Sequence, residues 1–124
     1  SEYRPALAAR DGKAFQPGTI PDGFYLVDDT ENLQPAFQQA VLQAVAAVTH
    51  IAPADEHQQI IGSPVLAPGI IAYPLQALGL CASATGARYT TTTEVYPDSA
   101  RTTPEECTAA QVAAVCAVME FVLR

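Results

Sequence analysis

The segment from Thr103 to Arg124 constrains the fold of this chain more than any other part of it. It opens with Thr103-Pro104-Glu105-Glu106, where threonine can cap a helix, proline suits the first helical position and the second glutamate can reach back to the cap. The residues after this start are apolar or small nearly all the way round, and the polar exceptions are Thr108, Gln111, Glu120 and Arg124. A helix with one face in water keeps a fuller polar face than this. We therefore predict a helix over about residues 104–123 that is either the central element of the fold or part of a subunit contact.

A subunit contact explains this helix best, because one small sheet gives too little cover for so apolar an element. We expect a second copy of the chain to cover its bulky side chains. The expected interface residues are Val112, Val115, Met119, Val122 and Leu123.

Length and composition indicate one globular domain. The chain has 124 residues, of which 49% are hydrophobic and 15% are charged, whereas charged residues make up about a quarter of an average soluble domain. A disordered chain combines low hydrophobicity with high net charge, and this one does not. Turn pairs such as Asp11-Gly12 and Pro17-Gly18 favour an extended N-terminal arm over residues 1–21, followed by a single domain over residues 22–124.

Charge is distributed unevenly along the chain. The formal net charge is −7, and residues 14–87 contain no lysine or arginine at all. Nucleic-acid binding requires clustered cations that displace counterions from phosphates, so we consider that function unlikely. The acidity favours a protein partner with a basic patch, although modest acidity also simply keeps a protein in solution.

The three cysteines, Cys81, Cys107 and Cys116, indicate free thiols, because an odd count without short-range pairing is typical of a reducing compartment. We expect a cytoplasmic protein or one carried inside a virus particle. The first residues lack the apolar run of a secretion signal. The apolar run of the last helix is too short and too interrupted to span a membrane.

The remaining elements predict an α/β or α+β fold. A short apolar run at 23–27 predicts a buried strand, and the alternation over 87–96 predicts a strand with one polar face. Between them, 32–49 predicts a long helix that Thr30 or Asn32 can cap. Its solvent-exposed side carries Gln34, Gln38, Gln39 and Gln43. The segment 64–73 predicts one or two further strands. We expect a small mixed sheet of three or four strands with the two long helices, 32–49 and 104–123, packed on one face.

The chain carries no motif for catalysis, metal binding or phosphate binding. His50 and His57 flank Asp55-Glu56, but Pro53 prevents both histidines from sharing one helical face, as a zinc protease requires. Cys81 lies in a Gly-x-Cys-x-Ser sequence that lacks the second glycine of a nucleophile elbow. We therefore expect no catalytic residue, no metal site and no cofactor.

Two groups of polar residues are candidates for ligand contacts. Asp28 and Asp29 lie where the first strand ends and a helix begins, a position that ligand sites favour and that turn and cap residues also favour. Arg88, Glu94 and Tyr96 are assigned to the polar face of the 87–96 strand, which is better explained as a solvated sheet surface.

Three classes of function stay open on this evidence. The first is a non-enzymatic, acidic, homodimeric assembly protein, a profile typical of viral or phage structural and assembly factors and of secretion-type chaperones. The second is a small oligomeric α/β enzyme with an active site between subunits. The third is a small-molecule-binding domain with a pocket lined by Phe24, Tyr73 and Tyr89. The apolar last helix favours the first.

Overall fold

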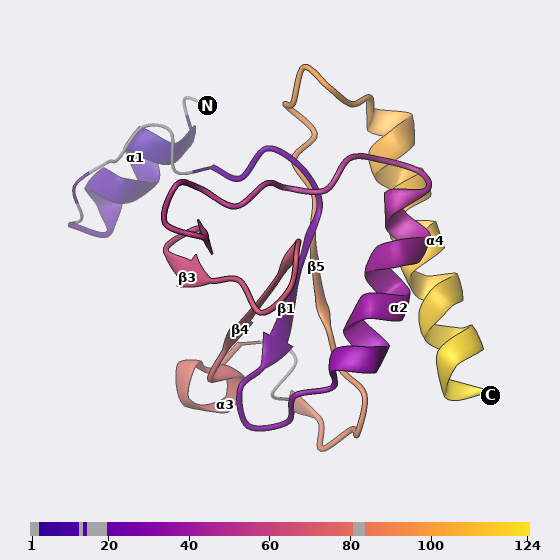
Figure 1. Cartoon of the computed structure of the whole chain (residues 1–124). Coiled ribbons are helices and arrows are strands. Elements are labelled where there is room, and N and C mark those ends of the chain that lie inside the picture. Colours follow the sequence, from indigo (N-terminus) through magenta and orange to yellow (C-terminus); the bar gives the residue numbers. More distant parts are fainter. Residues whose placement is uncertain (1–2, 13, 15–19, 81–83) are drawn as a thin grey trace.

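A computed structural model describes residues 3–12, 14, 20–80 and 84–124 of the chain. Its centre is a mixed sheet of three strands in the order β4-β1-β5 (Figure 1). These strands span Tyr25–Asp29 (β1), Ile70–Tyr73 (β4) and Thr92–Glu94 (β5). Helices and strands are both present in one unit, so the fold belongs to the α+β class, as the sequence pattern predicts.

Strand β1 is the middle strand and is buried on both faces. It runs parallel to β4, with Asp29 opposite Tyr73 where both strands end, and antiparallel to β5. Phe24 and Leu26 point to one side of the sheet, and Tyr25 and Val27 point to the other. This placement confirms the buried strand expected at 23–27 and explains why its residues are apolar without alternation.

The two long helices cover one face of the sheet, as predicted. Helix α2 spans Pro35–Ala46 and helix α4 spans Pro104–Val122, and they lie side by side (Figure 1). One hydrophobic cluster joins them to the sheet, and its buried members are Phe24, Leu26, Phe37, Val41, Val45, Ile70, Ala110, Ala114 and Ala117. The buried residues that α4 contributes to this cluster are all alanines. Their small side chains let the backbone of α4 approach α2 closely.

Smaller elements cover the other face. A hairpin of β2 (Gln59–Ile60) and β3 (Ser63–Pro64) and the short helix α3 (Leu75–Leu78) bring Ile60 and Leu75 against that side of the sheet. Helix α1 (Tyr3–Arg10) falls within the segment expected to form the N-terminal arm. It stands apart from the two-helix layer (Figure 1).

The prediction of a strand over 87–96 is wrong for most of that segment. Only Thr92–Glu94 pairs with β1, and residues 84–91 form an irregular segment. Tyr89 belongs to this segment and packs its ring on Phe37 and Phe121, with centroids 5.2 and 5.4 Å away. Aromatic contact with two helices therefore overrides the local β preference of the threonine run.

The start of α4 follows the sequence pattern closely. The Thr103 hydroxyl accepts a hydrogen bond from the backbone N–H of Glu106 at 3.1 Å. The Glu106 carboxylate in turn accepts one from the Thr102 hydroxyl at 3.0 Å, next to the cap rather than at the cap itself.

We expect Thr103→Ala to lower the free energy of unfolding by about 1 kcal/mol, because the N–H of Glu106 then has no capping partner. Thr108→Ala is the matched control, since that exposed hydroxyl only donates to the Pro104 carbonyl within the helix. Urea unfolding followed by circular dichroism measures both variants. Equal losses in the two variants would contradict the capping role.

Candidate functional site

The outward face of α4 carries a continuous row of exposed apolar side chains. Their exposed fractions are 56% for Val112, 59% for Val115, 56% for Met119, 50% for Val122 and 78% for Leu123. We call these five residues the α4 stripe. They are the residues that the sequence pattern predicts for an interface, and the structure leaves all of them uncovered by the rest of the described chain.

The spacing of the α4 stripe is that of a helix–helix seam. Val112, Val115, Met119 and Val122 follow one another at steps of three, four and three residues, which is the heptad pattern of two helices packed along their length. The opposite side of α4 already packs on α2 through Ala110, Ala114 and Ala117. The stripe is therefore a second packing surface on a helix whose first packing surface is in use.

Charges of opposite sign mark the two ends of α4. Glu105 and Glu106 lie in its first turn. Arg124 lies just after its last turn, with its guanidinium 5.2 Å from the centre of the Phe121 ring. The acidic end coincides with the positive end of the helix dipole, and the basic end with the negative end.

Asp28, one of the expected ligand-contact residues, is instead a buried structural carboxylate. It accepts hydrogen bonds from the backbone N–H of Asp29 at 2.9 Å and of Gln34 at 3.1 Å, and from the side-chain amide of Gln38 at 2.9 Å. The second bond caps the start of α2, where no local side chain does so. The caps expected from Thr30 or Asn32 are therefore wrong.

Gln38 completes this buried network, so its assignment to the solvent-exposed face of α2 is also wrong. Its amide donates to Asp28 and to the Thr90 carbonyl at 2.9 Å, and its carbonyl accepts from the Thr91 hydroxyl at 2.6 Å. The network ties β1 and α2 to the irregular segment before β5. Its polar atoms are paired with one another, which is how a buried polar group is tolerated.

The other expected ligand contacts come from different elements of the fold. Asp29 lies at the end of β1, and Arg88 lies in the irregular segment with its guanidinium 5.1 Å from the Tyr89 ring centre. Glu94 ends β5 opposite Tyr25, where partial burial raises the pKa of its carboxyl. Tyr96 lies beyond β5, so of the three residues assigned to one strand only Glu94 lies on it.

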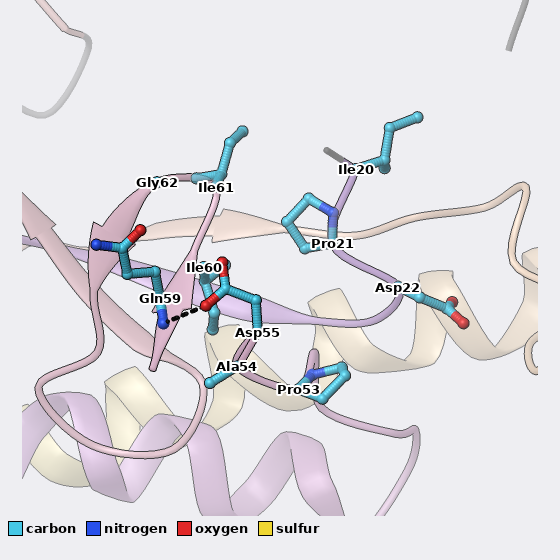
Figure 2. Close-up of a pocket in the computed structure, with 10 residues that line it drawn as sticks. All are labelled: Ile20, Pro21, Asp22, Pro53, Ala54, Asp55, Gln59, Ile60, Ile61 and Gly62. Carbon is cyan, nitrogen blue, oxygen red and sulfur yellow. Dashed lines mark hydrogen bonds between the residues drawn. The ribbon is translucent and has the colours of Figure 1, made fainter. Parts of the chain in front are cut away.

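A cleft opens between residues 20–22 and the loop that leads into the β2–β3 hairpin (Figure 2). Its volume is about 490 Å³, and its lining is mostly apolar, with Asp22, Asp55 and Gln59 as the polar members. The Asp55 carboxylate accepts bonds from the backbone N–H groups of His57 at 2.8 Å and Gln59 at 3.0 Å. Asp55 therefore shapes the loop, and we assign no ligand to this cleft.

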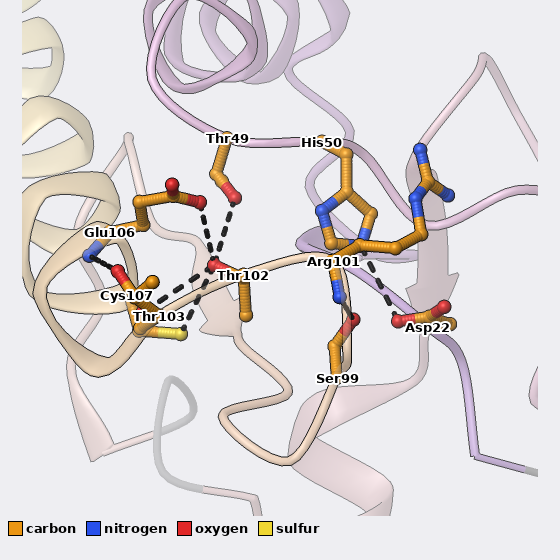
Figure 3. Close-up of polar contacts among 9 residues, drawn as sticks. All are labelled: Asp22, Thr49, His50, Ser99, Arg101, Thr102, Thr103, Glu106 and Cys107. Atoms are coloured by element: carbon orange, nitrogen blue, oxygen red, sulfur yellow. Dashed lines mark hydrogen bonds and ion pairs between the residues drawn. The ribbon is translucent and has the colours of Figure 1, made fainter.

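A polar junction, which the sequence did not predict, joins the start of β1 to the loops before α4 (Figure 3). His50 Nε2 lies 3.4 Å from Asp22 Oδ1, across 28 positions of sequence. The Thr102 hydroxyl lies near the Thr49 hydroxyl at 3.4 Å and the Cys107 sulfur at 3.9 Å. No periodic pattern in the sequence signals these contacts, because the residues come from three separate segments: 22, 49–50 and 102–107.

Within the part of the chain that the structure describes, these groups do not form a metal centre. No set of three His, Cys, Asp or Glu side chains among the described residues is placed to hold a metal ion. His57 lies exposed beside Glu56, whereas His50 contacts Asp22. Cys81, with its resemblance to a nucleophile elbow, lies outside the described residues.

The polar contacts of Asp22 have a consequence for stability at acid pH. The Ser99 side chain, followed by His50 and Arg101, favours the charged carboxylate and lowers the pKa of Asp22 below its ordinary 3.8. A carboxyl with a lowered pKa stabilises the folded state above its unfolded pKa, and that contribution disappears as the pH falls through the folded value.

We therefore expect Asp22→Asn to reduce the loss of stability on acidification between about pH 5 and pH 3, where aspartate carboxyls titrate. Thermal unfolding at a series of pH values measures this dependence, and the exposed Asp98 supplies the control Asp98→Asn. The same pH dependence in Asp22→Asn and in the unsubstituted protein would contradict a role for Asp22.

Comparison with known proteins adds no identification, since neither a protein-family model nor a curated protein matches this sequence. Within the described residues, no helix is long and apolar enough to cross a membrane. The proposals that follow therefore depend on the geometry of the molecule.

Proposed function

We propose that the protein is a non-enzymatic, homodimeric interaction or assembly protein, and that the α4 stripe is its dimer interface. The observation that carries the proposal is the row of five bulky apolar side chains, each at least half exposed. Single exposed apolar residues are ordinary on a protein surface, whereas a contiguous row marks a binding surface. The viral or phage assembly factors and secretion-type chaperones named above are examples of this class.

A second copy is the occupant that fits this surface best. A two-fold contact requires a surface complementary to itself, and an apolar seam with heptad spacing packs against an identical seam. In an antiparallel pair, Glu105 and Glu106 of one copy lie toward the Arg124 end of the other, and the two helix dipoles oppose each other favourably. A parallel pair brings the four glutamates together instead.

The size of the stripe indicates a dimer of moderate affinity. Covering the exposed half of a bulky aliphatic side chain contributes about 1 kcal/mol, so ten such side chains in two copies contribute about 10 kcal/mol. Association costs about 4–15 kcal/mol, because the two chains lose translational and rotational freedom. These two figures leave at most about 6 kcal/mol in favour of the dimer, so we expect a dissociation constant of tens of micromolar or weaker.

Analytical ultracentrifugation over a concentration series tests the proposal. We expect the mass to rise from that of the 13.1 kDa chain toward twice that value. The dimer is expected to be stronger at high salt, because salt screens the repulsion between two acidic copies. A particle of single-chain mass at every concentration, or a dimer that persists when the stripe is changed, would overturn the proposal.

A small-molecule-binding function is the alternative that a specific observation favours. The parallel strands β1 and β4 end side by side, and a polar crevice opens at their ends. This surface is separate from the α4 stripe, so the two functions are compatible.

A further inference from the structure

A crevice of about 290 Å³ lies outside the carboxyl ends of β1 and β4. The chain leaves β1 toward α2 on one face of the sheet and leaves β4 toward α3 on the other face (Figure 1). Two adjacent parallel strands whose following helices lie on opposite faces form a topological switch point. Open sheets with parallel strands bind their ligands in the crevice at such a point.

The lining of this crevice is polar and carries groups that both donate and accept hydrogen bonds. The described lining residues are Asp29, Gln76, Ala84, Thr85, Gly86, Ala87 and Thr90. None of them is cationic, which disfavours a phosphate or another anion. A single carboxylate, that of Asp29, lies among hydroxyl and amide groups.

Residues 84–90 form one wall of the crevice. Two side chains, one just before α2 and one within it, hold this segment in place by hydrogen bonds. The Asn32 amide donates to the Arg88 carbonyl at 2.9 Å, and the Gln38 amide donates to the Thr90 carbonyl at 2.9 Å. The Asp29 side chain is oriented by the bond that its Oδ1 accepts from the Glu31 N–H at 3.0 Å. The wall and the carboxylate are therefore positioned before any ligand arrives, as a binding site requires.

We propose that this crevice binds a small, neutral molecule with adjacent hydroxyl groups, such as a monosaccharide. A carboxylate accepts hydrogen bonds from two neighbouring hydroxyls, and the threonine and glutamine side chains can donate to the oxygens of the ligand or accept from its hydroxyls. An amine fits less well, because a cationic amine only donates and leaves the donors of Gln76, Thr85 and Thr90 without an acceptor. The volume suits a ligand of monosaccharide size rather than a dinucleotide.

Amide NMR spectra of the ¹⁵N-labelled chain during titration with D-ribose and with D-glucose test this proposal. We expect saturable shifts at Asp29, Gln76, Gly86 and Thr90 with at least one of the two sugars. Binding of 2-deoxy-D-ribose, which lacks one of the adjacent hydroxyls, is expected to be about tenfold weaker than that of D-ribose wherever D-ribose binds.

The matched variants are Asp29→Asn and Asp98→Asn. Asparagine at position 29 retains an acceptor for the Glu31 N–H, so the fold persists, while the loss of the carboxylate weakens sugar binding about tenfold. Asp98 is exposed elsewhere, and Asp98→Asn is expected to bind like the unsubstituted chain. The proposal is overturned if neither sugar gives saturable shifts at these amides, if methylammonium binds there and the sugars do not, or if Asp29→Asn leaves sugar affinity unchanged. None of these results bears on the dimer, whose test is the mass of the particle.

Discussion

Val115→Glu is expected to raise the dissociation constant of the dimer at least about a hundredfold. Val115 lies in the middle of the α4 stripe, and its side chain is 59% exposed in the single chain. In a two-fold dimer the substitution places two carboxylates in the seam, where each loses water without gaining a cationic partner. The measurement is the concentration dependence of the mass by sedimentation.

The same variant is expected to unfold at nearly the same temperature as the unsubstituted chain when both are dilute. Substitutions at an exposed surface change the free energy of unfolding by about 0.5 kcal/mol or less. Gln43→Glu is the matched control, because it adds the same charge at an exposed position of α2 and leaves the stripe intact. Equal weakening of the dimer by both substitutions would show that net charge, and not the stripe, governs association.

Asp28→Ala is expected to lower the free energy of unfolding by about 3 kcal/mol, and the midpoint of thermal unfolding by roughly 10 °C. Asp28 is buried, and its carboxylate accepts three hydrogen bonds, from two backbone N–H groups and the Gln38 amide. Alanine leaves these donors without their acceptor at a position that is only 1% exposed. Differential scanning calorimetry measures the change.

Asp29→Ala is the control for this prediction. Asp29 is the next residue in the sequence, and its side chain accepts a single local hydrogen bond, from the Glu31 N–H near the surface. We expect a loss below about 1 kcal/mol, typical of one exposed hydrogen bond. Similar losses in the two alanine variants would contradict the assignment of Asp28 as the residue that joins β1 to the start of α2.

The sequence predicts α4 well because its determinants are local. The cap, the proline and the acidic first turn all fall within residues 103–106, and the structure begins the helix at Pro104. The exposure of the apolar face was expected as well. Whether a second copy covers it stays a prediction.

The start of α2 was not predictable in the same way. Its cap comes from Asp28, six residues before Gln34 and on the preceding strand. Gln38 looks like a surface residue by helical position, yet it faces inward because Asp28, Thr90 and Thr91 satisfy its amide. A polar residue can be buried whenever distant residues supply its partners, and a periodic pattern does not contain that information.

In the segment before β5, the sequence predicts regular structure that does not form. Its alternation and its threonines favour a strand over 87–96, but only three residues pair with β1. The Tyr89 ring packs on the rings of Phe37 and Phe121 instead. The carbonyls of Arg88 and Thr90 accept hydrogen bonds from the side chains of Asn32 and Gln38. The pairing of Asp22 with His50 likewise depends on tertiary contact between loops.

The most direct test of the dimer interface is an NMR experiment on a mixture of ¹³C-methyl-labelled and unlabelled chains, filtered for contacts between different copies. The antiparallel seam predicts contacts between Val115 of one copy and Met119 of the other, and between Val112 and Val122 across the pair. Intermolecular contacts confined to surfaces other than α4, or none at concentrations above the expected dissociation constant, would contradict the account.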